Sequence, residues 1–319
     1  MSFLTVCLNP TIQKTLCFSS ITPGAVNRAA AHRLDVSGKG INVTRVLTQL
    51  GKKTVHLTQL GGIMRPLLLS LCEQDGLTVE WAESGSEIRF CYTVLNEKSG
   101  AVTELIEGTQ PVAPDTEKLL MEKFDEIIAP ARVQDSSSSR GVPRCLIISG
   151  TKAAGFSDML IPGMVMKAKE KGLMVILDIK ENDLINSLKY EPDVIKPNLD
   201  EFLHTFGPGT DIETDLNGFV QELARKYRCS VIITNGSRKV IAAGCAHRAD
   251  ACGARTAGGG IFTADVTPVK AVNTTGCGDA FTAGLAAALA EGAELKAAIA
   301  EGMRCGALNA ALVRPGVIR

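Results

Sequence analysis

Short apolar runs alternate along the chain with longer amphipathic stretches. Apolar runs of this length, rich in β-branched residues, are typical of strands buried on both faces of a sheet. They predict strands over residues 3–8, 54–57, 145–148, 174–177 and 231–234. Apolar positions spaced three and four apart predict helices over 41–50, 65–74, 116–128, 157–171 and 212–227. Strands that alternate with helices imply right-handed crossovers, so the pattern predicts a doubly wound α/β fold with a mostly parallel sheet.

Two regions depart from this alternation. Residues 14–34 and 89–106 hold short β-prone runs separated by turn residues, and neither region has a helical period. We expect them to form a small separate sheet near the carboxyl ends of the main strands, where open α/β sheets bind ligands and where such a sheet acts as a lid. Two separate solvent-facing hairpins fit the pattern equally well.

Composition narrows the class of protein. Among the 319 residues, 34 Lys and Arg balance 34 Asp and Glu, which argues against nucleic acid as a partner because such domains are usually strongly basic. The ten cysteines form no Cys-x-x-Cys pair, so no zinc or redox motif is indicated and reduced thiols in a cytoplasm are expected. No apolar run approaches the roughly 18 residues of a membrane span, so we predict a cytoplasmic protein without membrane contact.

The segment 273–284 contains the strongest chemical signal. Gly276 and Gly278 directly precede a helix of small residues, and the unpaired amides of a helix start attract anions. The amides of Gly276, Cys277 and Gly278 are therefore predicted to hold a phosphoryl group, with Asp279 as the general base that deprotonates the attacking hydroxyl. The alternative is structural, because acidic residues and glycines are common at helix starts. The sulfur of Cys277 is interpreted as a small filler.

A second glycine cluster opens the helix predicted over 41–50. Gly38 and Gly40 permit close approach of a polyhydroxylated ligand, Asn42 offers an amide donor and acceptor, and Lys39 can meet a negative charge. An ordinary glycine-rich turn with Asn near the N-cap is the structural alternative.

The third cluster is Lys-Pro-Asn-Leu-Asp-Glu at 196–201. Asn198 and Glu201 are three residues apart at a helix start, so both side chains can reach one water-coated Mg²⁺. The same spacing fits a capping box, in which Asn and Glu satisfy backbone amides instead.

In combination these motifs resemble the ribokinase-like (PfkB-type) carbohydrate kinases. The resemblance covers almost the whole chain and rests on segments 8–10, 38–42, 196–201, 234–236 and 276–279. It implies one domain over 1–319, a three-layer αβα sandwich with a β-sheet lid from inserts at about 12–36 and 88–108. It further implies ATP as the phosphoryl donor, Mg²⁺ as cofactor, and possibly a homodimer formed through the lids.

Segments 8–10, 26–28 and 88–89 are similar to fructose-1-phosphate and tagatose-6-phosphate kinases within that family. The resemblance makes Asp279 the base and the amides of 276–278 the anion hole. It assigns to the sugar and its phosphate Gln13, Arg28, Gly38, Lys39, Gly40, Asn42 and Arg89. It assigns to the nucleotide and magnesium Lys196, Asn198, Glu201, Thr234 and Gly236, with Asn198 and Glu201 acting on the metal through water.

Two departures from the family pattern predict an altered sugar preference. Gln13 stands where the family has an Asp that binds sugar hydroxyls, and an amide binds hydroxyl donors less strongly than a carboxylate. The loop Gly-Thr-Lys-Ala-Ala-Gly at 150–155 replaces Gly-Ser-Leu-Pro-x-Gly and adds Lys152. Two other functions remain open at this point: a kinase of an unphosphorylated sugar or nucleoside, and a sugar- or nucleotide-binding regulator without efficient chemistry.

Overall fold

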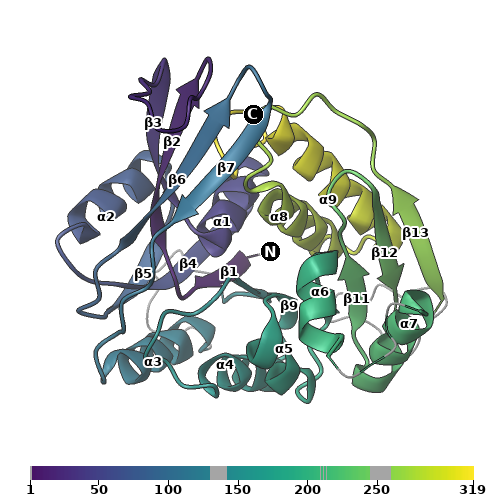
Figure 1. Cartoon of the computed structure of the whole chain (residues 1–319). Coiled ribbons are helices and arrows are strands. Elements are labelled where there is room, and N and C mark those ends of the chain that lie inside the picture. Colours follow the sequence, from purple (N-terminus) through teal and green to yellow (C-terminus); the bar gives the residue numbers. More distant parts are fainter. Residues whose placement is uncertain (1, 130–141, 209, 211, 213, 245–259) are drawn as a thin grey trace.

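The computed structural model describes residues 2–129, 142–208, 210, 212, 214–244 and 260–319 (Figure 1). Within them, one large sheet has the strand order β13-β12-β11-β10-β9-β8-β1-β4-β5. Neighbouring strands are parallel from β5 to β11, and β12 and β13 add an antiparallel edge. The strands are β1 (Ser2–Cys7), β4 (Lys53–Leu60), β5 (Val79–Glu83), β8 (Cys145–Ser149), β9 (Met174–Asp178), β10 (Val194–Ile195), β11 (Ser230–Ile233), β12 (Lys239–Ala243) and β13 (Ile261–Asp265). The predicted mostly parallel sheet is confirmed.

Helices cover both faces of this sheet, so the predicted three-layer architecture is confirmed. One apolar core joins the sheet to α3 (Thr116–Ile128), α4 (Leu160–Glu170), α5 (Glu181–Leu188), α6 (Leu199–Phe206) and α7 (Leu216–Tyr227). A second core joins the other face to α1 (Lys39–Gln49), α8 (Cys277–Ala290) and α9 (Leu295–Ala310). Helix α2 (Arg65–Gln74) contributes to a third cluster with strands of the small sheet. Among the described helices, none is both long enough and apolar enough to cross a bilayer.

Two of the predicted helices begin later than expected. The segment predicted from 212 starts its helix at Leu216, because the side chain of Asp215 accepts a hydrogen bond from the amide of Gly218 and caps the helix there. The segment predicted from 157 starts at Leu160, after Ser157, which is occupied by hydrogen bonds to Glu117. A side-chain cap therefore sets the start of α7, whereas α4 begins after Met159 without a side-chain cap.

The second sheet consists of β2 (Thr11–Phe18), β3 (Ala31–Ser37), β6 (Arg89–Asn96) and β7 (Ala101–Ile106). Its order is β3-β2-β6-β7, with β2 and β6 parallel, so the two inserted segments share one sheet. The alternative of two separate hairpins is wrong. Strands β2 and β6 follow the carboxyl ends of β1 and β5, which places this sheet at the ligand-binding edge of the main sheet (Figure 1). The single-domain division of the chain stays a prediction.

Candidate active site

Asp279 lies buried in the first turn of α8, next to the start of α1. Asn42 Nδ2 donates to Asp279 Oδ2 at 2.8 Å. Burial raises the pKa of Asp279 to about 6, and the carboxylate of Asp178 adds to the rise, while Lys39, Asn42 and Lys196 oppose it. A carboxylate with a pKa this close to neutrality is suited to accept a proton from a hydroxyl.

The backbone before Asp279 has the form expected of an anion site. Gly276 caps α8 in the left-handed conformation with φ 82°, and a Cβ there would lie 2.7 Å from the amide nitrogen of Gly316, so only glycine fits. The amide of Cys277 donates to Thr274 O at a long 3.3 Å, a bond that an anion would have to share. Burial raises the pKa of the Cys277 thiol, which agrees with its interpretation as a filler.

Two lysine side chains lie beside this helix start. Lys196 is buried, with Nζ 3.4 Å from Asp178 Oδ2, and a Cβ on Gly278 would lie 3.9 Å from the same nitrogen. Lys39 Nζ lies 2.9 Å from Glu201 Oε1 and 3.7 Å from Asp178 Oδ1. Burial alone would lower the pKa of Lys39, but the surrounding carboxylates outweigh it and raise the pKa above its ordinary value. Nζ of each lysine therefore lies where the phosphoryl group is expected, and the raised pKa keeps Lys39 charged there.

Asp178 is a central residue that the sequence analysis missed. It ends β9 and is buried, and its Oδ2 accepts hydrogen bonds from Ser149 Oγ at 3.2 Å and Thr282 Oγ1 at 3.1 Å. Burial would raise its pKa, but Lys196 and Lys39 outweigh burial and lower it, so Asp178 stays ionised and orients both lysines. The sequence did carry a signal for Asp178: a carboxylate directly after an apolar strand lies at the carboxyl edge of a parallel sheet, where ligands bind.

The segment from Lys196 to Glu201 lies beside Thr234. Asn198 and Thr234 form a parallel bridge, Leu199 N donates to Thr234 O at 2.9 Å, and Thr234 N donates to Pro197 O at 3.2 Å. The residues predicted to serve the nucleotide are thus brought together from two strand ends, with exposed Gly236 in the following turn at φ 54°.

Asn198 and Glu201 form a reciprocal capping box at the start of α6. Asn198 Oδ1 accepts from the amide of Glu201 at 2.8 Å, and Glu201 Oε2 accepts from the amide of Asn198 at 3.1 Å. The capping box that the sequence left open for this pair is therefore present. Their action on magnesium through water stays a prediction, and no group of three or more His, Cys, Asp and Glu side chains in the described ranges is arranged to hold a metal ion.

The second glycine cluster, Gly38 and Gly40, packs α1 against β1. A Cβ on Gly40 would lie 2.7 Å from the carbonyl oxygen of Val6, and one on Gly38, at φ 117°, would lie 3.0 Å from Cys7 Sγ. These glycines bring Lys39 and Asn42 to the end of β1. Contact of Gly38 and Gly40 with a sugar stays a prediction.

The predicted sugar-binding residues of the small sheet occupy different environments. Gln13 is buried and donates from Nε2 to Thr93 Oγ1 at 2.5 Å. Arg89 is partly buried, with Nη1 3.5 Å from Glu107 O, and its buried Nε has no hydrogen-bond partner in the described part of the chain. Arg28 lies exposed on the connection from β2 to β3, and none of the hydrogen bonds or ion pairs found among the described residues joins it to Asp279 or its neighbours.

The altered loop at 150–155 is held by its own contacts. Lys152 Nζ lies 2.9 Å from Asp158 Oδ1 and 2.5 Å from Asp183 Oδ1, so its charge is compensated at the start of α5. Thr151 Oγ1 accepts a hydrogen bond from Asn9 Nδ2 at 3.2 Å. The loop therefore shapes this edge of the site without adding an unpaired charge.

A carboxylate at a helix start beside two lysines, at the edge of a parallel sheet that carries a second small sheet, is the arrangement expected of the ribokinase-like carbohydrate kinases. The chain matches the pfkB family carbohydrate kinases over residues 7–314, and it belongs to this family. It is a sugar kinase, and kinases of this family use ATP.

Curated relatives and solved structures agree with this assignment. A tagatose-6-phosphate kinase from Staphylococcus epidermidis is 27% identical over 292 residues, covering 90% of this chain and 84% of the relative. A 1-phosphofructokinase from Vibrio cholerae is 26% identical over 239 residues, covering 75% of this chain and 71% of the relative. Phosphofructokinase-2 from Escherichia coli shares the fold with a TM-score of 0.81 at 21% identity, covering 97% of this chain and 93% of that structure.

Proposed function

We propose that the protein transfers the γ-phosphoryl group of ATP to a hydroxyl of a phosphorylated ketohexose of the fructose 1-phosphate or tagatose 6-phosphate type. The observation that carries this proposal is the buried Asp279 carboxylate in the first turn of α8, held by Asn42 and flanked by Lys39 and Lys196. In phosphoryl transfer the protein contributes mainly position and electrostatic stabilisation, and this arrangement supplies both.

In the proposed reaction the acceptor hydroxyl gives its proton to Asp279. Its oxygen forms a bond to the γ-phosphorus while the bond from that phosphorus to the bridging oxygen of ADP breaks. The amides at 276–278 and the ammonium group of Lys196 stabilise the negative charge of the group in transfer. Magnesium, when bound to the ATP phosphates, neutralises further charge. Asn198 and Glu201 fit such an ion through its water shell, because Mg²⁺ needs few protein ligands when phosphates are present.

The remaining predicted residues fit two subsites. We assign Thr234 and Gly236 to the nucleotide, because they adjoin the segment that ends in Glu201. We assign Gln13, Gly38, Gly40 and Asn42 to the sugar.

We assign Arg89 and Arg28 to the phosphate already present on the substrate. The unpartnered, buried Nε of Arg89 supports this role, because a buried guanidinium donor normally has an acceptor and a phosphate oxygen supplies one. The names of the relatives, tagatose-6-phosphate kinase and 1-phosphofructokinase, support the same substrate class.

A homodimer through the lid is also part of this proposal. Strand β7 is an edge strand of the small sheet, and its last two residues, Leu105 and Ile106, are 55% and 58% exposed. Exposed apolar edge strands are ready to pair with another chain. Light scattering on the purified protein would measure the mass, and a monomer at micromolar concentration would contradict the dimer.

The test of the proposed function is a coupled assay for ADP release from ATP. Fructose 1-phosphate and tagatose 6-phosphate should give turnover well above that with fructose, tagatose or a nucleoside. Preference for an unphosphorylated sugar or a nucleoside would overturn the substrate class. Binding by calorimetry without ADP release would instead show a regulator that does not catalyse the reaction.

Substitution of Arg89 tests the phosphate subsite in the same assay. We expect Arg89→Ala to raise the KM for the phosphosugar by about tenfold or more, since a charge-assisted hydrogen bond is lost, and to leave the KM for ATP unchanged. The control is Arg304→Ala, which removes an arginine paired with Glu301 on the exposed face of α9 and should change neither value. An equal effect of Arg89→Ala on both substrates would contradict the assignment.

A further inference from the structure

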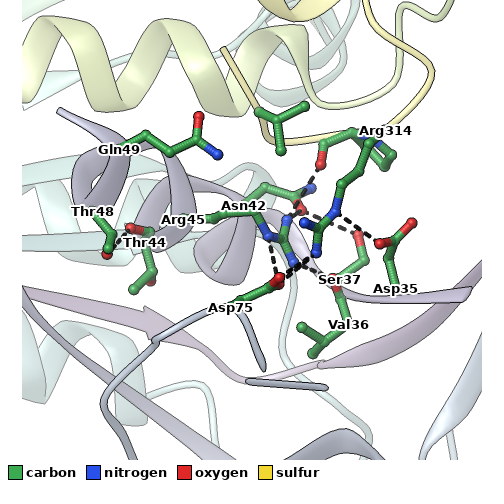
Figure 2. A network of polar contacts seen from close by, with 12 residues as sticks. Asp35, Val36, Ser37, Asn42, Thr44, Arg45, Thr48, Gln49, Asp75 and Arg314 are labelled. Carbon is green, nitrogen blue, oxygen red and sulfur yellow. Dashed lines mark hydrogen bonds and ion pairs between the residues drawn. The ribbon is translucent and has the colours of Figure 1, made fainter. Parts of the chain in front are cut away.

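The amide of Asn42 connects Asp279 to a buried arginine. Its nitrogen end donates to Asp279 Oδ2 at 2.8 Å, and its oxygen end accepts from Arg45 Nη1 at 3.0 Å and from Ser37 Oγ at 3.3 Å. Figure 2 shows the guanidinium of Arg45 reaching the Asn42 side chain one turn earlier in α1. Asn42 therefore has a different kind of partner at each end.

Arg45 is held rigidly at this position. It is buried; its Nε donates to Asp75 Oδ2 at 2.9 Å, its Nη2 to Val36 O at 2.5 Å, and its Nη1 also to Pro315 O at 3.3 Å (Figure 2). Burial and the neighbouring Arg314 lower the pKa of Arg45, but from so high a value that the group stays charged. Its nitrogens therefore act only as donors.

The C-terminal segment packs against this pair of side chains. A Cβ on Gly316 would lie 2.7 Å from the Cβ of Asn42 and 2.9 Å from Arg45 Nη1. The backbone of Gly316 thus packs closely against both side chains.

An asparagine amide has two ends of nearly the same shape, one a donor and one an acceptor, so its partners decide which end faces which group. The hydroxyl of Ser37 rotates and can serve as donor or acceptor, so it leaves the choice open. Arg45 has no acceptor and forces the Asn42 oxygen toward itself, which leaves the nitrogen for Asp279.

We propose that Arg45 is a positioning residue of the phosphoryl transfer, which orients the Asn42 amide so that its N–H group, and not its oxygen, faces Asp279. The inference rests on the proposed function, because it assigns a partner to the base of that reaction. With the N–H group facing it, Asp279 is favoured as the carboxylate that can accept a proton. With the oxygen facing it, the protonated and inactive acid would be favoured.

The pH dependence of Asp279 also depends on other groups that face it. These groups are Lys39 of α1, Cys7 of β1, Asp178 of β9, Lys196 after β10, and Cys277 of α8 itself. None of them forms a hydrogen bond or ion pair with Arg45 in the contacts found across the described residues, so a substitution of Arg45 leaves their charges in place.

The experiment compares Arg45→Gln with Arg45→Lys in the ADP-release assay over pH 5–9. Gln offers both a donor and an acceptor, whereas Lys is donor-only like Arg. We expect Arg45→Gln to move the acid limb of kcat/KM upward by about 0.5–1 pH unit, to lower kcat more at pH 6 than at pH 8, and to leave the KM for ATP unchanged. In Arg45→Lys the acid limb of kcat/KM should stay at the wild-type position.

The matched control is Arg314→Gln, which removes the other arginine paired with Asp75 and does not touch Asn42. Its acid limb should stay at the wild-type position. If Arg45→Gln and Arg45→Lys shift the limb equally, or if Arg314→Gln shifts it as much, Arg45 has only a structural role and the inference is overturned.

A measurement without turnover separates this inference from the proposed function. In protein labelled with ¹⁵N-asparagine, the side-chain N–H signal of Asn42 should titrate with a midpoint near the Asp279 pKa of about 6 and lose this titration in Asp279→Asn. This titration does not require any Arg45 variant to fold. An Asn42 signal that is flat from pH 5 to 7 overturns the inference, whereas absence of turnover with every sugar overturns the proposed function alone.

Discussion

The most informative single residue is Asp279, because its environment suits a reaction better than it suits stability. A carboxylate whose pKa is raised to about 6, chiefly by burial, is ionised at neutral pH at a cost to the fold. Lys39 and Lys196 compensate only part of this cost, since the net shift remains upward. Such a strained group is typical of a functional site.

Asp279→Asn should separate activity from stability. We expect kcat to fall by at least about 10²-fold, because the proposed general base is lost. The raised pKa means that the folded state is favoured most when Asp279 is protonated, below its ordinary value of 3.8, and that this advantage is lost as the pH rises to about 6. Removing the ionised group should therefore stabilise the protein at pH 7 by up to about 3 kcal/mol.

Urea unfolding at pH 4 and pH 7, together with the ADP-release assay, measures both effects. The control is Asp265→Asn, which removes an exposed carboxylate on β13 and should change neither activity nor stability. Near-wild-type turnover of Asp279→Asn would remove this residue from the proposed mechanism.

At the scale of elements, the site depends on how closely α1 approaches β1. Gly40 makes this contact possible, because a Cβ there would lie 2.7 Å from the carbonyl oxygen of Val6. The same helix presents Lys39 and Asn42. A displacement of its first turn would therefore move two groups that contact the carboxylates of the site.

Gly40→Ala should destabilise the protein by about 1–3 kcal/mol, as overpacking does, and should lower turnover through displacement of the first turn of α1. Gly163→Ala is the matched control: Gly163 also lies within a helix, α4, but no atom lies within 4 Å of its added Cβ. In this control the free energy of unfolding should rise by up to about 1 kcal/mol, because alanine has a higher helix propensity than glycine. Thermal unfolding and ADP release measure both variants, and equal stability of the two would contradict the packing argument.

At the scale of the whole molecule, a set of ion pairs joins the lid, which is the second sheet, to helix α1 and to the C-terminal segment. Asp35 of β3 pairs with Arg33. Arg314 pairs with both Asp35 and Asp75, and Asp75, after α2, also pairs with Arg45 of α1 (Figure 2). Of these residues, Arg45 is the one that also donates to Asn42 Oδ1, so Arg45 connects the ion pairs to the hydrogen-bond partner of Asp279.

This network predicts a loss of stability in acid. Burial alone would raise the pKa of Asp75, but Arg314 and Arg45 outweigh burial and lower it. The pKa of Asp178 is lowered in the same way by Lys196 and Lys39. A lowered pKa contributes stability above the unfolded value of 3.8 that is lost as the pH falls below it.

Asp75→Asn should lower the free energy of unfolding by about 3 kcal/mol at pH 7, because it leaves two arginines without their shared carboxylate. It should also weaken the dependence of stability on pH below 4. Urea unfolding between pH 3 and pH 7 measures both, with Asp265→Asn again as the control. A pH dependence unchanged from the wild type would show that Asp75 does not contribute to acid unfolding.

The local pattern of the chain was enough to predict the alternating strands and helices of the main sheet, the β-prone segments outside it, and the motifs around Gly40, Lys196 and Asp279. These signals are local, since periodicity, glycine positions and helix-start residues act within a few positions of each other. Sequence alone left open whether Asn198 and Glu201 form a capping box, and whether the lid segments pair with each other. Both questions depend on contacts that spacing does not report.

The class of fold thus lies in the sequence itself, and so does the prediction that Asp279 is the base. Only the tertiary structure revealed Asp178 between two lysines, Arg45 behind Asn42, and Gly316 against both. These residues come from distant segments: Asn42 and Gly316, for example, are 274 positions apart. The physical reason is that charge compensation and hydrogen-bond polarity depend on distance in space, and the parallel sheet brings distant strand ends to one edge.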